Sequence, residues 1–199
     1  MAYPTVSAPY GLKPINLIGG QVFAGATRQL KIASGYAANL LNGDIVKIVS
    51  SGTVEKDTGT ATATPVGVFL GCTYTDPSLG YTLFSQYWPT GTVASDAFAY
   101  ISDDPDALYK VVVTAAGTST VSSVARTAIG NNSALIQGTG STTTGDSAVS
   151  ISATTATTNT LPIRIIDIVP DTKTASDTFV EVIVKWNFGM HQYDNATGV

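Results

Sequence analysis

The residues best suited to chemistry are few and lie far apart in the sequence. The single histidine, His191, lies in a polar C-terminal stretch, and the single cysteine, Cys72, lies in the apolar run VGVFLGCTY. No serine stands in a G-x-S-x-G turn, and neither glycine-rich nucleotide-binding pattern occurs. Cys72 has no basic or histidine neighbour in sequence, so a buried, unreactive thiol is favoured over a nucleophile. We predict that the protein is not an enzyme and that His191 has a surface or contact role.

An acidic turn is the densest group of titratable residues. Asp103, Asp104 and Asp106 lie within four positions of one another. Three interpretations are open: a solvated turn, a calcium site, or paired carboxylates for glycoside hydrolysis. The spacing lacks the final glutamate of an EF-hand, and the solvated turn is favoured. Nearby, Tyr87 and Trp88 could stack on a sugar, although an aromatic pair at a strand end more often fills a core.

The composition predicts an all-β protein that works through contact surfaces. Thr, Val and Ile occupy 62 of the 199 positions, only 12% of residues are charged, and no segment has a sustained helical period. One cysteine and one histidine exclude a disulfide framework and disfavour zinc, so we expect no metal and no cofactor. A net charge of −4 argues against nucleic acid as a partner, and the lack of a long apolar run argues against a membrane span. The N-terminal residues do not resemble a signal peptide.

Charge is distributed unevenly along the chain. No Asp or Glu precedes Asp44, and residues 1–28 mix prolines, glycines and isolated apolar residues without a steady period. We predict that residues 1–28 form an extended N-terminal arm, and a solvated tail is the alternative. The aromatic and aliphatic residues favour docking on a partner surface. The candidate partner-binding residues are Tyr3, Tyr10, Leu12, Lys13, Ile15, Leu17, Phe23 and Arg28.

The rest of the chain is a series of short strands separated by close turns. Residues 29–92 contain NGD and SSG turns and the buried run PVGVFLGCTY, which is typical of a small β-barrel or sandwich. Residues 93–199 repeat this style, with LPIRIIDIV and TFVEVIVKWNF as the clearest strands. We therefore expect a small barrel-like domain at 29–92 and a second, sandwich-like β region at 93–199. The two regions could be two packed subdomains or one body.

One part of the chain suggests a family. The run NGDIVKIVSSGTVEKDTGTATATPVGVFLGCTY resembles the core of decoration proteins from the heads of tailed bacteriophages. The opening APYGLKPINLIGG and the later strands are similar to structural proteins of phages. The positions that carry the resemblance are Gly43, Asp44, Ile45, Val46, Gly52, Pro65, Val66, Gly67 and Val68.

The resemblance implies a capsid decoration, or cement, protein. Such a protein binds the exterior of the virion head, is often a homotrimer, and bridges neighbouring subunits of the major capsid protein. It would be made in the host cytoplasm, with no small-molecule substrate. A head fibre or tail protein and a carbohydrate-binding β-sandwich are the alternatives. The sandwich predicts aromatic side chains exposed on a sheet face.

Overall fold

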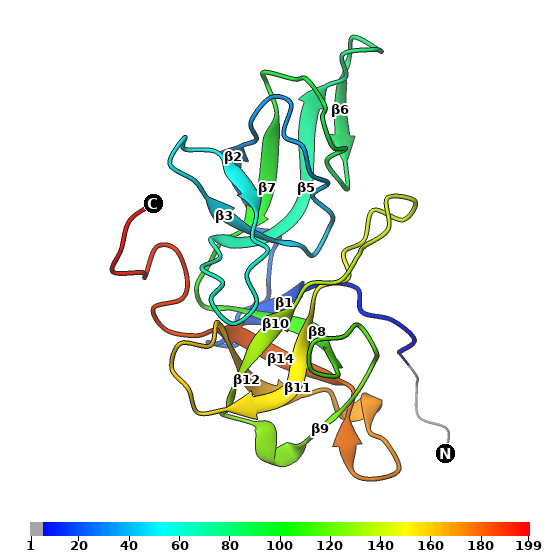
Figure 1. Cartoon of the computed structure of the whole chain (residues 1–199), viewed down its shortest axis with the longest axis vertical. Helices are drawn as coiled ribbons and strands as arrows, with labels where there is room; N and C mark the ends of the chain where they lie inside the picture. Colours follow the sequence, from blue (N-terminus) through cyan, green and yellow to red (C-terminus); the bar gives the residue numbers. More distant parts are fainter. Residues whose placement is uncertain (1–5) are drawn as a thin grey trace.

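The computed structural model describes residues 6–199 and confirms the all-β prediction. Two β bodies lie one above the other, and strands make up almost all of the regular structure (Figure 1). Short 3-10 turns at Arg126–Ala128 and Pro170–Thr172 are the helical pieces of the described chain. No helix among residues 6–199 is long and apolar enough to cross a membrane.

The lower body, called here the closed barrel, is a five-stranded barrel with an added strand. The strands β8, β11, β10, β12 and β14 pair in that order, and β14 returns to pair with β8. The added strand β1 pairs with β8 beside β11. A two-stranded ribbon of β9 and β13 completes this body. The bounds are β1 Lys13–Leu17, β8 Ala107–Thr114, β9 Val124–Ala125, β10 Asn132–Ile136, β11 Ser150–Ala156, β12 Ile163–Ile168, β13 Thr178–Phe179 and β14 Glu181–Trp186.

The upper body, called here the upper sheet, has the strand order β2-β7-β5-β3-β4, and β6 pairs with β5. A bridge between Ile32 and Val54 links the two ends of this order and curls the sheet. The bounds are β2 Arg28–Lys31, β3 Ile45–Ile48, β4 Val54–Lys56, β5 Gly67–Thr75, β6 Thr82–Ser85 and β7 Phe98–Ser102.

Apolar β-branched runs produce the two interiors. In β8, the run Val111–Val113 is fully buried, as expected of a strand with neighbours on both edges and packing on both faces. In the upper sheet, Trp88 is fully buried and contacts Tyr74 edge-on, with ring centroids 5.2 Å apart. The core interpretation of Trp88 is therefore confirmed, and the indole is not available to stack on a sugar.

The path of the chain differs from the expected division at residues 28 and 92. Residues 13–17, expected in the extended arm, form β1 and pair with β8. Residues 98–102, expected in the second region, form β7 and pair with β2 and β5 of the upper sheet. The upper sheet is thus built from one stretch inserted between β1 and β8. Sequence spacing could not reveal this because β1 and β8 lie about ninety residues apart and pair only in the folded chain.

The two bodies are joined by a buried polar contact and a shared core. Asp44 is fully buried, and both carboxylate oxygens accept from Lys56 Nζ at 2.9 Å. Asp44 Oδ1 also accepts from the Ser147 hydroxyl at 2.6 Å. Ser147 lies in the loop between β10 and β11 of the closed barrel. Beside this contact, the N–H of Leu12 donates to the carbonyl of Gly43 at 3.0 Å, and the Leu12 side chain is fully buried. The N-terminal segment therefore passes between the bodies as part of the fold.

Candidate interaction surface

The predicted partner-binding residues fall into two groups in the structure. Tyr3 lies outside the described residues. Leu12 is fully buried, which corrects the expectation that it faces a partner. Tyr10, Lys13 and Arg28 bind polar groups of the same chain, and Leu17 packs against the core of the closed barrel. Ile15 and Phe23 remain partly exposed.

Tyr10 is held against the closed barrel by a small polar network. Its hydroxyl donates to Glu181 Oε1 of β14. Lys110 Nζ lies 3.4 Å from the same carboxylate oxygen and 5.6 Å from the centre of the Tyr10 ring. Burial, followed by the hydrogen bond to Glu181, raises the pKa of Tyr10 well above its ordinary value. The phenol therefore stays protonated at neutral pH and anchors the segment as a donor.

The two basic residues of the segment already have partners within the chain. Lys13 Nζ donates to Asn42 Oδ1 at 2.5 Å and to Asp146 Oδ1 at 3.0 Å. Arg28 Nε donates to Asp103 Oδ2 at 2.5 Å. Both cations therefore face carboxylates of the same chain, which weakens any electrostatic attraction of this segment to an acidic partner surface.

Apolar side chains of the segment remain exposed at a hairpin, residues 13–22, called here the N-terminal hairpin. Its turn is closed by the N–H of Leu17 donating to the carbonyl of Gln21 at 2.8 Å. The exposed fractions of Ile15, Ile18 and Val22 are 36%, 50% and 77%. Large aliphatic side chains this exposed on one short hairpin mark a surface suited to burial against a partner.

A hollow of about 450 Å³ lies beside the N-terminal hairpin, and Ile18 forms part of its wall. Phe188, just after β14, also lines it and is 89% exposed. The guanidinium of Arg164 lines the hollow and donates through Nε to Asn132 at 2.9 Å. Across the same hollow Lys185 is paired with Asp106 at 2.7 Å. The hollow thus combines an exposed aromatic ring and an aliphatic wall with a cation that has no carboxylate partner among residues 6–199.

The three aspartates of the acidic turn each have a different partner. Asp103 binds Arg28, Asp106 binds Lys185, and Asp104 accepts the backbone N–H of Asp106 at 2.8 Å. Within the described part of the chain no three carboxylate, histidine or cysteine side chains gather as a metal ion would need. These contacts favour the turn interpretation, in which aspartates bind nearby backbone and basic groups.

His191 is buried, contrary to the expected surface or contact position. It is 1% exposed, its Nδ1 accepts the N–H of Tyr193 at 3.3 Å, and the two rings meet edge-on at 5.2 Å. Next to it, the N–H of Gln192 donates to the carbonyl of Pro65 in the upper sheet at 2.8 Å. Burial lowers the pKa of His191 below its ordinary value. The C-terminal stretch therefore ties the closed barrel to the upper sheet, which its polar sequence did not reveal.

Cys72 is almost fully buried, as predicted. Burial raises the pKa of its thiol to about 12. The thiol therefore stays protonated at neutral pH and packs as a small apolar group.

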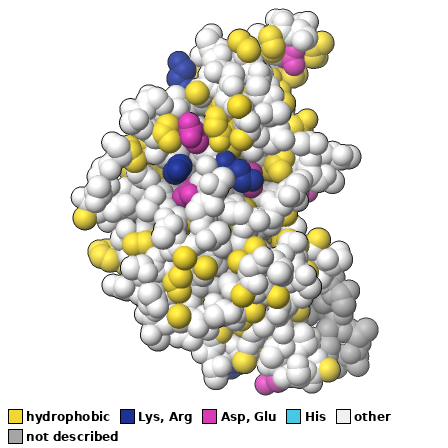
Figure 2. Space-filling model, in the orientation of Figure 1, with side chains coloured by type: hydrophobic (Ala, Val, Ile, Leu, Met, Phe, Trp, Pro, Cys, Tyr) yellow, Lys and Arg dark blue, Asp and Glu magenta, His cyan; other side chains and the backbone are white. Residues whose placement is uncertain are grey.

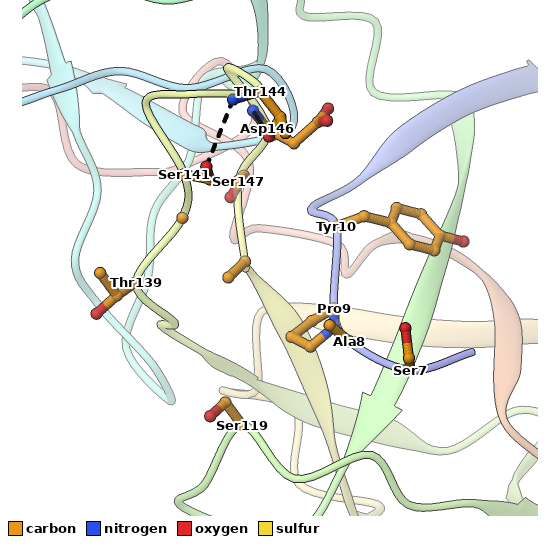
Figure 3. A pocket seen from close by; sticks show the side chains of 12 residues that line it. Ser7, Ala8, Pro9, Tyr10, Ser119, Thr139, Ser141, Thr144, Asp146 and Ser147 are labelled. Atoms are coloured by element: carbon orange, nitrogen blue, oxygen red, sulfur yellow. Dashed lines mark hydrogen bonds between the residues drawn. The ribbon is translucent and has the colours of Figure 1, made fainter.

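A second hollow, of about 530 Å³, separates residues 7–10 from the loop between β10 and β11 (Figure 3). Its wall is rich in hydroxyl groups, and the Tyr10 side chain points away from those of the loop (Figure 3). The most polar of these side chains are engaged, since Ser147 donates to Asp44 and Asp146 binds Lys13. The hydroxyls have no histidine beside them among the described residues, because the single histidine is buried against Tyr193 and does not line this hollow.

The outer face of the upper sheet carries an aromatic row that sequence reasoning missed. Phe84 of β6 and Phe98 of β7 both lie opposite Thr73 of β5, and they are 79% and 37% exposed. Beside them, Gly71 lies in a shallow groove of about 550 Å³, with Tyr100 on its wall. The missed signal was the alternation in YTLFSQ, which places Phe84 and Leu83 on opposite faces of one short strand.

Hydrophobic side chains on the face seen in Figure 2 form small groups over both bodies, and charged side chains are sparse. No protein-family model, curated protein or solved structure matches the chain.

Proposed function

We propose that this chain is a virion structural protein, a decoration protein that binds the exterior of a phage head and bridges neighbouring subunits of the major capsid protein. The proposal rests on the resemblance of residues 42–74 to head decoration proteins, together with an all-β body that offers contact surfaces. It includes assembly around a symmetry axis as a homotrimer, with the major capsid protein as partner. Many weak contacts repeated over a shell would hold such a protein through multivalency.

The observation that supports this function most directly is the exposed N-terminal hairpin. Leu12 and Lys13 fix its base to the two bodies, while Ile18 and Val22 face solvent. Burying an aliphatic side chain fully stabilises a contact by about 1.5–3 kcal/mol. Because the hairpin is attached to a folded body, docking it on a capsid would cost less conformational entropy than ordering a free tail.

The decisive experiment is co-sedimentation of the full chain with heads of the phage that encodes it, prepared without this protein. The wild-type chain is expected to pellet with the heads. The double variant Ile18→Asp and Val22→Asp should bind at least tenfold more weakly, because two charges would have to be desolvated at the contact. Deleting the segment is a poorer test because the deletion would remove Leu12 from the core.

The control is Val93→Asp, which places one aspartate at an exposed valine in the loop between β6 and β7 of the upper sheet. This variant should pellet like the wild type. The proposal fails if the wild-type chain stays in the supernatant. The assignment to the hairpin fails if the double variant binds as tightly as Val93→Asp.

Carbohydrate binding is the second candidate, and the aromatic row of the upper sheet favours it. Phe84 and Tyr100 line the groove around Gly71, and Phe98 lies next to it, opposite Thr73, so exposed rings could stack on a sugar. A glycan array probed with the full chain tests this function. Retention on a glycan that Phe98→Ala abolishes, together with failure to bind heads, would replace the decoration proposal.

A further inference from the structure

Strand β6 is an uncovered edge of the upper sheet. It pairs with β5 alone and lies at the outer side of that sheet (Figure 1). The N–H of Asp76 donates to the carbonyl of Tyr81 at 3.1 Å, which identifies that pair as hydrogen-bonded. In an antiparallel ladder such pairs alternate, so Leu83 and Ser85 point their backbone groups toward β5. The N–H and C=O groups of Thr82 and Phe84 therefore point away from the sheet.

Nothing among residues 6–199 occupies this edge. No backbone hydrogen bond from the turns and loops reaches Thr82 or Phe84. Natural sheets usually protect such an edge by a very short strand, lysine, proline, a bulge or a covering loop. Strand β6 is short, with four residues that read TLFS, but no charged residue occurs between Asp76 and Asp96. Phe84 stands on this uncovered edge with 79% of its surface exposed.

We propose that β6 is a self-association edge, which pairs antiparallel with β6 of a second copy of this chain. The two-fold axis would pass beside Leu83, which then lies opposite its own equivalent. Thr82 of each copy would lie opposite Phe84 of the other, and each of these two pairs exchanges both of its N–H···O bonds. The outward-facing groups of one strand therefore satisfy those of its copy, and the contact is self-complementary.

The side chains fit the same register. An aromatic residue opposite a β-branched residue is a favourable cross-strand pair, and the register forms the Thr82–Phe84 pair twice. The strand is uncharged, so bringing two copies together opposes no like charges. We favour a second copy over a different protein because β6 carries in its own sequence every group that the contact needs. The outward N–H and C=O groups of Thr82 and Phe84 in one copy pair with those of Phe84 and Thr82 in the other. The edge is short, so the contact would be weak in solution and stronger in any array that repeats it.

The test is sedimentation velocity of the full chain over concentrations from micromolar to millimolar, which needs no phage heads. The wild type should shift to a larger species as concentration rises. Phe84→Lys places a lysine on the edge and should abolish the two-fold contact. The mass of the larger species should then fall by half, because each two-fold contact joins two equal units, whether these are monomers or assemblies held by other contacts. Phe188→Lys is the matched control, because Phe188 is equally aromatic and 89% exposed on the closed barrel.

Amide hydrogen exchange locates the contact and separates it from a folding defect. The amides of Thr82 and Phe84 should exchange slowly at high concentration and fast on dilution, and fast at both concentrations in Phe84→Lys. Unchanged circular dichroism of that variant would show that the fold is intact. The proposal is overturned if the wild type stays monomeric throughout, if Phe84→Lys keeps the mass of the wild type, or if these amides exchange fast at every concentration. Head binding is measured separately, so failure of this contact leaves the decoration proposal intact.

Discussion

The closed barrel and the upper sheet manage their strand edges differently. In the closed barrel β14 returns to β8, so its backbone groups are paired around the ring. The upper sheet leaves β6 with one partner and Phe84 in solvent. Each strand of the ring has a neighbour on both edges, so the ring offers a partner side chains alone, whereas the open edge of β6 also offers backbone groups. The same β-rich composition thus yields two kinds of contact surface.

The largest expected effect comes from breaking the contact that joins the two bodies. In Asp44→Ala the ammonium group of Lys56, which is mostly buried, loses the carboxylate that neutralises it. The substitution should therefore lower the free energy of unfolding by about 3–5 kcal/mol. Urea unfolding followed by tryptophan fluorescence measures it. In Trp186→Phe only Trp88 reports, from the upper sheet, and in Trp88→Phe only Trp186 reports, from the closed barrel.

With Asp44 intact, the two tryptophans should report coincident transitions. The control Asp106→Ala breaks the exposed pair with Lys185 and should cost less than about 1 kcal/mol. Separate transitions with Asp44 in place would contradict a joined fold.

A smaller loss is expected from removing the apolar anchor of the N-terminal segment. Leu12 is fully buried in the core of the closed barrel, so Leu12→Ala should lower the free energy of unfolding by about 3 kcal/mol. Ile18→Ala, on the exposed hairpin, should change it by no more than about 0.5 kcal/mol. Equal effects of the two substitutions in denaturant titrations would show that residues 10–18 behave as one solvated arm.

The contribution of His191 to the free energy of unfolding should depend on pH. Burial lowers the pKa of His191 in the folded protein below the unfolded value of 6.5. The folded state therefore binds the proton less readily, so the stabilisation is complete above pH 6.5 and is lost as pH falls through the folded-state pKa. The charges of Asp194 and Asp103 partly oppose the shift.

The check is to compare the free energy of unfolding at pH 7.5 and about pH 5 for the wild type and His191→Gln. Because His191 is the single histidine, the variant removes all histidine titration. The wild type should lose more stability than the variant on acidification. An identical loss in both proteins would place the titration elsewhere.

The smallest effect on folding should come from the exposed aromatic residues. Phe84→Lys and Phe188→Lys should each change the free energy of unfolding by no more than about 0.5 kcal/mol, because both side chains are in solvent. Thermal unfolding of dilute protein measures this. A large loss in Phe84→Lys alone would mean that Phe84 supports the upper sheet rather than a contact between copies.

Sequence patterns predicted most strands but not their grouping. The runs IVKIV, PVGVFLGCTY and ALYKVVVTA became β3, β5 and β8 because continuous β-branched and apolar residues suit buried strands. The stretch VARTAIG, whose pattern fits either a short strand or a single helical turn, forms a two-residue strand followed by a 3-10 turn. Strand β1 was missed because Pro14 and a bulge between Pro14 and Asn16 interrupt its alternation.

The candidate surface was only partly predictable. Composition marked residues 10–28 as apolar and free of acids, but it could not tell which side chains the fold would use. Leu12 and Ile15 are both aliphatic, yet Leu12 is fully buried and Ile15 is 36% exposed. Their exposed fractions differ because the chain carries Leu12 between the two bodies, beside Gly43.

By itself, the sequence determined that this chain folds as strands and carries few charged residues, one histidine and one cysteine. The strands follow from a local property, since β-branched side chains favour extended backbone. Tertiary structure alone decided that β1 joins β8, that His191 is buried, and that β6 lacks a second neighbour. The physical reason is that pairing and burial depend on residues far apart in the chain, which meet only in the folded protein.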